Sequence, residues 1–178
     1  MCLKGRVFLF GDNIDTDIIA PGGYLHLGLD VLKLHSMEAL DQNFSKVVKP
    51  RDIIVAGHNF GAGSSREQAP LVLKDLGIEL VVAVSFARIF FRNAINVGLN
   101  IGSINDMEYS RIRDRDSVEY NQEQGILNIE RDGISVPYTN PSGPVLEIIA
   151  SGGLVNYVRK LVKKQDSPHS YETKKDKN

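Results

Sequence analysis

The residues most able to do chemistry in this sequence lie between Gly57 and Glu67. This short segment holds two adjacent serines, Ser64 and Ser65, followed by Arg66. A guanidinium group offers a planar pair of N–H donors that suits a carboxylate or a phosphate, and serine hydroxyls add further hydrogen bonds. The pattern therefore predicts a site for an anion.

The elements around this segment are expected to make it a strand-to-helix turn. Ile53–Ala56 is a short apolar run typical of a strand buried on both faces, and residues 64–76 have the spacing of a helix that ends at Gly77. At a helix N-terminus, backbone N–H groups point outward and the helix dipole favours an anion. Gly61 and Gly63 permit a positive φ and a close approach of a ligand to the backbone.

A simpler interpretation is that the serines only cap the helix. Ser64 or Ser65 would then be the N-cap residue, and Glu67 or Gln68 would complete a capping box. Two glycines, two serines and an arginine at one turn exceed what a cap requires, so we favour a ligand site. The segment lacks the lysine of a P-loop, the third glycine of a dinucleotide fingerprint and the Gly-x-Ser-x-Gly frame of a serine hydrolase.

The rest of the chain is expected to form one α/β domain around this turn. Arg6–Phe10 and Leu80–Val84 have the pattern of further strands, and Phe86–Asn96 that of a second helix. This succession implies a parallel strand pair with a right-handed crossover. Three short antiparallel strands are expected later in the chain, at residues 116–120, 126–131 and 134–138.

The C-terminal part has two expected segments. Apolar residues recur at helical spacing from Leu154 to Val162, so a last helix is expected there, closing the fold. Residues 165–178 are polar and charged and are expected to be a disordered tail. The domain is therefore expected to span residues 1–164.

The composition excludes several classes of function. Of the 178 residues, 42% are hydrophobic and 24% are charged, as in a soluble globular domain. Lys and Arg total 21 against 22 Asp and Glu, so no basic field is available for nucleic acid or an anionic membrane. The lone cysteine, Cys2, excludes an internal disulfide and an all-cysteine metal site held by this chain alone. A cytoplasmic location is expected, because neither a signal-peptide pattern nor a membrane-spanning apolar run is present.

Three blocks of the sequence resemble, in the same order, the signature of the swivel domain of the aconitase superfamily. They are GDNIDTDIIAP at residues 11–21, NFGAGSSREQAP at 59–70, and SFARIF at 85–90 with its continuation through 93–99. The chain has the length of a stand-alone small subunit, as in the isopropylmalate dehydratases. The resemblance implies an α/β fold of the swivelling β/β/α type, with a mixed parallel and antiparallel sheet or partial barrel flanked by helices.

The resemblance also implies a reaction and a partner. The reaction is a hydro-lyase step that removes and re-adds water at a 2-hydroxy di- or tricarboxylate. In that family a large partner subunit holds a [4Fe-4S] cluster, so this chain is expected to bind no cofactor and to work as a heterodimer or heterotetramer. Ser64 matches the serine that removes the carbon-bound proton as an alkoxide, while Ser65 and Arg66 match binders of substrate carboxylates.

Other polar residues near the blocks are expected to support the loops. Asp12, Asp15 and Asp17 lack the closing glutamate of a calcium loop, so we expect turns and hydrogen bonds instead. His58 is expected to order its loop rather than to transfer protons, and no histidine is expected to bind a metal. The residues assigned to loop support are Asp15, Thr16, Asp17, Asn59, Gly61 and Gly63.

The loop Gly22–Gly28 matches the part of the family that borders the variable end of the substrate. Homoaconitase-like relatives tend to carry an arginine just after a Tyr-Leu pair, whereas this chain has His26 and Leu27 after Tyr24 and Leu25. A desolvated carboxylate facing no cation is costly, so these residues favour an apolar substituent. We therefore expect 3-isopropylmalate and leucine biosynthesis rather than homocitrate or citrate. The alternatives that remain open are the small subunit of a homoaconitase, methylmalate or dimethylmalate dehydratase, and a non-catalytic anion-binding regulatory module.

Overall fold

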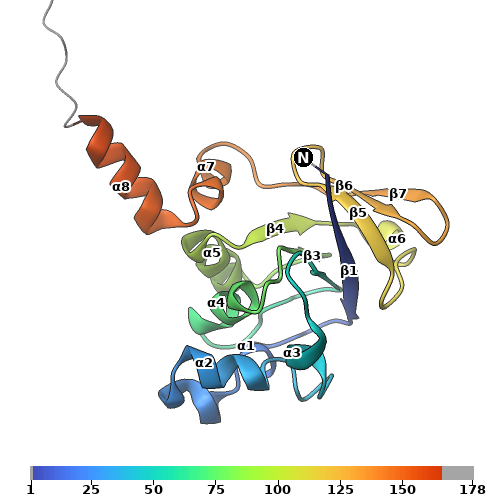
Figure 1. The fold of residues 1–178 in the computed structure, drawn as a ribbon, viewed down its shortest axis with the longest axis horizontal. Coiled ribbons are helices and arrows are strands. Elements are labelled where there is room, and N and C mark those ends of the chain that lie inside the picture. Colours follow the sequence, from blue (N-terminus) through green and yellow to red (C-terminus); the bar gives the residue numbers. More distant parts are fainter. Residues whose placement is uncertain (1, 166–178) are drawn as a thin grey trace, which may run out of the picture.

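The centre of the molecule is one seven-stranded sheet with the strand order β4-β3-β2-β1-β5-β6-β7 (Figure 1). The structure is a computed structural model, and it describes residues 2–165. The strands are β1 Cys2–Phe10, β2 Ile53–Ala56, β3 Leu80–Ala83, β4 Asn100–Ser103, β5 Ser117–Asn121, β6 Ile126–Ile129 and β7 Ile134–Pro137. The three predicted antiparallel strands and the predicted parallel pair β2–β3 are all present.

Strand β1 joins a parallel half of the sheet to an antiparallel half. Its first residues, Cys2–Arg6, pair antiparallel with β5, and its last residues, Val7–Phe10, pair parallel with β2. The sheet also curls until its two edges touch: Thr139, just after β7, bridges antiparallel to Ser103 of β4, with N–H to O distances of 2.7 and 2.9 Å. The expected mixed sheet or partial barrel is therefore confirmed.

Helices cover the parallel half of the sheet, and short helical turns fill the connection between β1 and β2 (Figure 1). Helix α4 connects β2 to β3, and α5 connects β3 to β4. The helices and 3₁₀ turns are α1 Thr16–Ile19, η1 Gly22–Leu27, α2 Leu29–Leu32, η2 Lys33–His35, α3 Phe44–Val47, α4 Gln68–Asp75, α5 Arg88–Val97, α6 Asp106–Tyr109, α7 Pro144–Ala150 and α8 Leu154–Gln165.

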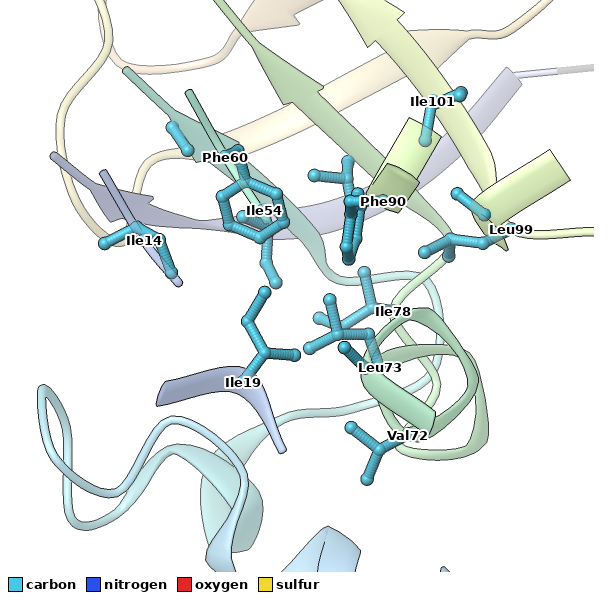
Figure 2. Packing of buried hydrophobic residues seen from close by; sticks show 14 of the residues in the cluster. Ile14, Ile19, Ile54, Phe60, Val72, Leu73, Ile78, Phe90, Leu99 and Ile101 are labelled. Atoms are coloured by element: carbon cyan, nitrogen blue, oxygen red, sulfur yellow. The ribbon is translucent and has the colours of Figure 1, made fainter. Parts of the chain in front are cut away.

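Strands β2 and β3 are buried on both faces, as their unbroken apolar sequences predict. Alternate side chains point to opposite sides of the sheet, so each strand contributes to two cores. Ile54 and Val81 join the cluster under the helices, which Figure 2 shows in close-up. Ile53 and Val82 join a second cluster on the opposite face, inside the curl of the sheet. These two cores fix the ends of β1, β2 and β3, from which the loops that carry the three sequence blocks emerge.

The carboxylate of Asp52 ties β1 to the start of β2. Its side chain is 3% exposed and accepts hydrogen bonds from the backbone N–H groups of Arg6 and Lys49, both at 2.9 Å. The Arg6 guanidinium completes the set, with Nη2 at 2.7 Å from Oδ2. One buried carboxylate thus satisfies donors from three directions and holds the parallel pair in register.

The last helix does not close the fold, contrary to the expectation from its apolar spacing. Figure 1 shows α8 extending from the body of the molecule, where it contacts α7 and α5. The sheet face in that region is already covered by α5 and α7, so the apolar side chains of α8 remain 39–63% exposed. They are Leu154, Val155, Val158, Leu161 and Val162.

The expected C-terminal tail falls almost wholly outside the described residues. Gln165, where the tail was predicted to begin, is the last residue of α8, and residues 166–178 lie beyond the part of the chain that the structure describes.

Replacing Asp52 with alanine should lower the free energy of unfolding by about 2–4 kcal/mol, because three donors lose a buried, charged acceptor. Urea unfolding followed by circular dichroism measures this loss. The matched control is Asp30→Ala, whose side chain is 93% exposed in its ion pair with Lys33 and should change stability by less than about 0.5 kcal/mol. Equal effects of the two substitutions would contradict the role assigned to Asp52.

Candidate active site

Three loops meet where β1, β2 and β3 end, and the backbone itself joins them. The loop after β2 receives the loop after β1 on one side: Gly61 N–H donates to Ile14 O at 2.7 Å, and Thr16 N–H donates to Ala62 O at 2.8 Å. On its other side, Phe60 pairs with the loop after β3 through a parallel bridge to Phe86. The three sequence blocks that carry the resemblance therefore form one continuous surface.

Apolar side chains beneath the surface hold the central loop down. Ile14, Phe60 and Phe90 lie in one buried cluster (Figure 2), and the Phe60 and Phe90 rings meet edge to face at 5.1 Å. Gly61 crosses directly above Phe90 with a φ of +78°, and a Cβ atom added to it would lie 2.1 Å from Phe90 Cγ. Only glycine can both adopt this backbone conformation and fit this close approach.

The helix after the central loop begins later than the sequence predicts. Its first residue is Gln68, and the N-cap residue Glu67 makes no side-chain capping bond, so Ser64 and Ser65 are neither cap nor helix. The Ser64 N–H donates to Thr16 Oγ1 at 3.1 Å, and Ser65 O accepts from Asn93 Nδ2 at 3.2 Å. The serines are thus tied to neighbouring elements, and the predicted start of the helix at Ser64 is wrong.

Ser64 lies beside a buried hydroxyl. Thr16 Oγ1 is 3.1 Å from Ser64 Oγ as well as 3.1 Å from Ser64 N, and Thr16 is 1% exposed. Both Ser64 and Ser65 are exposed to solvent. The arrangement presents one serine hydroxyl on the surface with a second hydroxyl fixed beneath it.

Arg66 provides the positive charge of the site. Its Nη1 donates to Asp17 Oδ1 and, at 3.2 Å, to Ala20 O. The hydrogen bond from Arg66 holds the pKa of the Asp17 carboxyl below its usual range. Within residues 2–165, Nε and Nη2 of Arg66 make no hydrogen bond, so one edge of the guanidinium remains for a ligand such as a carboxylate.

The remaining loop residues bond to one another. Asp15 Oδ1 accepts from Ile18 N at 2.8 Å and so caps α1, and Asn59 Nδ2 donates to Asn13 Oδ1 at 3.0 Å. Gly63, like Gly61, has a positive φ, of +93°. These contacts shape the loops from within.

His58 connects the central loop to α6. Its N–H donates to Asp12 Oδ1 at 2.7 Å, and its Nε2 lies 2.8 Å from Asp106 Oδ1. The sequence patterns did not predict the contact between His58 and Asp106, nor the contact between Ser65 and Asn93 of α5. Asn93 stands inside the third block, which was the available signal, whereas nothing in the sequence points to Asp106.

The loop expected to border the substrate divides into an inner and an outer half. Tyr24 and Leu25 pack against the core under the helices, and the Tyr24 ring stacks on His35 at 3.6 Å. His26 is exposed and Leu27 is 49% exposed. Of the four candidates, only His26 and Leu27 face outward. The loop begins beside Arg66, since a Cβ atom on Gly22 would lie 3.3 Å from Nη2.

Between residues 2 and 165, no three His, Cys, Asp or Glu side chains gather as metal ligands. Cys2 is exposed at the first position of β1, at the end of the strand away from the three loops. No helix in this part of the chain has the length and apolar character needed to span a bilayer.

Comparisons with known proteins agree with the resemblance read from the sequence. A family model described as the aconitase C-terminal domain matches residues 29–101. The 3-isopropylmalate dehydratase small subunit of Halothermothrix orenii is 46% identical over 92% of this chain and 99% of its own length. The methanogen homoaconitase small subunit of Methanocaldococcus jannaschii is 49% identical over 90% and 93%.

A solved structure supports the fold as well. The crystal structure of 3-isopropylmalate dehydratase (LeuD) from Methanocaldococcus jannaschii has a TM-score of 0.85 with this chain, at 47% identity. The alignment covers 93% of this chain and 99% of that one.

Replacing Gly61 with alanine should destabilise the protein by about 3–5 kcal/mol, since the methyl group adds a collision with Phe90 to the strain of a positive φ. The control is Gly133→Ala, which has a φ of +63° but open space around it and should cost about 1–2 kcal/mol. Thermal unfolding of both variants separates the two terms. A loss at Gly61 no larger than that at Gly133 would contradict the close packing described above.

Proposed function

Because this chain belongs to the small subunits of the aconitase family, we propose that it is the small subunit of a 3-isopropylmalate dehydratase. The complex would interconvert 2- and 3-isopropylmalate through 2-isopropylmaleate, a dehydration and rehydration in leucine biosynthesis. The observation that carries the proposal is the placement of Ser64 Oγ on an open face, beside Arg66 and above the buried Thr16 hydroxyl.

Ser64 is the proposed base. A serine hydroxyl is far too weak an acid to lose its proton unaided at neutral pH, so its oxyanion needs positive potential and the absence of water. Arg66, two residues along, supplies the charge. The terminus of α4 contributes less than the sequence suggested, since the helix begins four residues after Ser64 and dipole effects fall off within a turn.

Arg66 and Ser65 are the proposed binders of the substrate carboxylates. The ion pair with Asp17 uses Nη1 of Arg66 and so orients the guanidinium, while Nη2 and Nε keep their hydrogens for a carboxylate. A dicarboxylate held there would place its carbon-bound hydrogen near Ser64. The proton would pass to Ser64 Oγ as the hydroxyl leaves the neighbouring carbon. To complete the isomerisation, Ser64 would protonate the carbon that lost the hydroxyl, and water would add to the carbon that lost the hydrogen.

The exposed position of the site supports the need for a partner. Ser64 and Ser65 face solvent in this chain, and an alkoxide in contact with bulk water is not a usable base. We propose that a large subunit covers this face, in a heterodimer or heterotetramer, and that the complex works in the cytoplasm.

The partner would also hold the family's iron–sulfur cluster, which supplies a Lewis acid at the leaving hydroxyl. The donor set of this chain does not fit such a cluster. Cys2 is its one cysteine and lies away from the loops, and no other group of metal-binding side chains occurs within residues 2–165. The roles proposed for this chain are therefore binding, orientation and proton transfer.

The outer half of η1 supports an apolar substituent on the substrate. His26 and Leu27 face outward on a loop that begins beside Arg66, and neither offers a permanent cation to a third carboxylate. The 49% identity to a homoaconitase small subunit supports a second candidate, a tricarboxylate dehydratase. Assays of the assembled complex with 2-isopropylmaleate and with cis-homoaconitate distinguish the two.

In the complex with its large subunit, Ser64→Ala should lower kcat for hydration of 2-isopropylmaleate about 10³-fold or more while the complex still assembles. Ser135→Ala, which changes a serine of β7 bonded to Asn128, should leave kcat unchanged. Near-normal turnover in Ser64→Ala would contradict the assignment of the base. Turnover by this chain without any partner would contradict the two-subunit arrangement.

His26→Arg should change specificity, because it places a cation at the proposed variable end of the substrate. We expect kcat/KM for 2-isopropylmaleate to fall about tenfold and that for cis-homoaconitate to rise. Leu34→Arg adds the same charge at a side chain of η2 that is 58% exposed and should alter neither value. If both substitutions act alike, η1 does not set the substrate.

A further inference from the structure

The hydroxyl of Thr16 has both of its hydrogen-bond contacts on one residue. It lies 3.1 Å from the N–H of Ser64 and 3.1 Å from the Ser64 hydroxyl, and no other described residue bonds to it. Thr16 is 1% exposed, so within this chain bulk solvent does not reach its hydroxyl, although Ser64 itself is exposed. A buried polar group is normally satisfied, and here Ser64 alone satisfies it.

The number of hydrogens and lone pairs on each hydroxyl decides which one donates in the bond between Thr16 Oγ1 and Ser64 Oγ. Thr16 Oγ1 has one hydrogen and two lone pairs, and one lone pair receives the N–H of Ser64. In the neutral pair either oxygen can donate to the other. Once Ser64 has lost its proton, however, only Thr16 has a hydrogen to give.

We propose that Thr16 is a positioning residue for the reaction: it donates its hydroxyl hydrogen to Ser64 Oγ and so stabilises the alkoxide form of the base. This inference rests on the proposed function. The alkoxide forms when Ser64 gives its proton to the carbon that is protonated in the rehydration step, or to solvent before the substrate covers the site. When Ser64 takes the proton of the substrate carbon, that C–H bond breaks and the Ser64 O–H bond re-forms. The O–H bond of Thr16 stays intact throughout.

The backbone around Thr16 holds its side chain in place for this task. Its N–H donates to Ala62 O at 2.8 Å, and its carbonyl accepts from Ala20 N at 2.9 Å. The branched Cβ restricts χ1, which limits the directions in which the hydroxyl can point. Gly63 leaves the necessary space, since a Cβ atom there would lie 3.3 Å from Thr16 Oγ1. The donor is therefore oriented before the reaction starts.

Most charged side chains near Thr16 and Ser64 are engaged with other groups, so a neutral hydroxyl donor has a distinct role beside Ser64. Asp15 directs its carboxylate to the N–H of Ile18, and Asp17 directs its own to Arg66. Glu67, on the other side of Arg66, is exposed and caps nothing. Because Arg66 shares its charge with Asp17 and with the proposed carboxylate ligand, a pre-oriented hydroxyl adds stabilisation that the cation does not supply.

The test uses Thr16→Val, which keeps the shape but removes the hydroxyl, and Thr16→Ser, which restores it, in the complex with the large subunit. We expect Thr16→Val to lower kcat about 100-fold with KM within about threefold, and Thr16→Ser to recover most of the loss. In a Ser64→Ala background, Thr16→Val should cause no further loss. In the dehydration direction, with a hydroxy acid deuterated at the carbon that loses its hydrogen, the primary deuterium isotope effect on kcat should rise in Thr16→Val, because proton transfer becomes slower.

Each outcome has a distinct meaning. If Ser64→Ala is inactive while Thr16→Val keeps kcat within twofold, the inference is overturned and the proposed function stands. If Ser64→Ala is active, the proposed function itself fails. A further loss from Thr16→Val in the Ser64→Ala background would show a purely structural role and would also overturn the inference. If Thr16→Val does not fold, as thermal unfolding would reveal, Thr16→Ala carries the same comparison without a buried methyl group next to the Ser64 N–H.

Discussion

The site depends on main-chain hydrogen bonds that continue the parallel pairing beyond the ends of the strands. Residues Ile14 and Thr16 bond to Gly61 and Ala62 in this way, and Phe60 bonds to the loop after β3. Backbone groups make these bonds, and the packing of Gly61 against Phe90 keeps the loop close enough to form them. The bonds bring Thr16 and Ser64, separated by 48 positions in the chain, to within hydrogen-bonding distance of each other.

The electrostatics of the site follow from this arrangement. The central loop is tied to α1 rather than to its own helix, so Arg66 meets Asp17 of α1, and the serines leave the influence of the helix terminus. The resulting surface combines one partly engaged cation with hydroxyl groups. Such a surface suits a carboxylate, whereas an oxyanion on Ser64, as proposed, would need water to be excluded. This supports a subunit that is completed by its partner.

Sequence patterns predicted the elements whose side chains need no distant neighbour. The apolar runs of β2 and β3 and the glycine stop after α4 at Gly77 were predictable, because burial on both faces and a glycine with positive φ each leave a local signature. The start of α4 was not predictable from the sequence. A serine followed by an acid or amide three residues later looks the same in a cap and in a loop, and here the hydrogen bond from Ser64 N–H to Thr16 makes it a loop.

For α8, the spacing predicted a helix and an apolar face, but periodicity does not say what that face meets. The same limit applies to η1, where the sequence selected four residues and packing turned two of them inward.

The 3₁₀ turn η1 contributes no fully buried residue to either core. Its exposed half can therefore change at little cost in folding stability, whereas Ser64, Thr16 and Arg66 are held by specific contacts that few substitutions preserve. If the roles proposed for η1 and Ser64 hold, the substrate could change while the proposed base stayed in place. Two relatives that share nearly half of this sequence carry different enzyme names, 3-isopropylmalate dehydratase and homoaconitase small subunit.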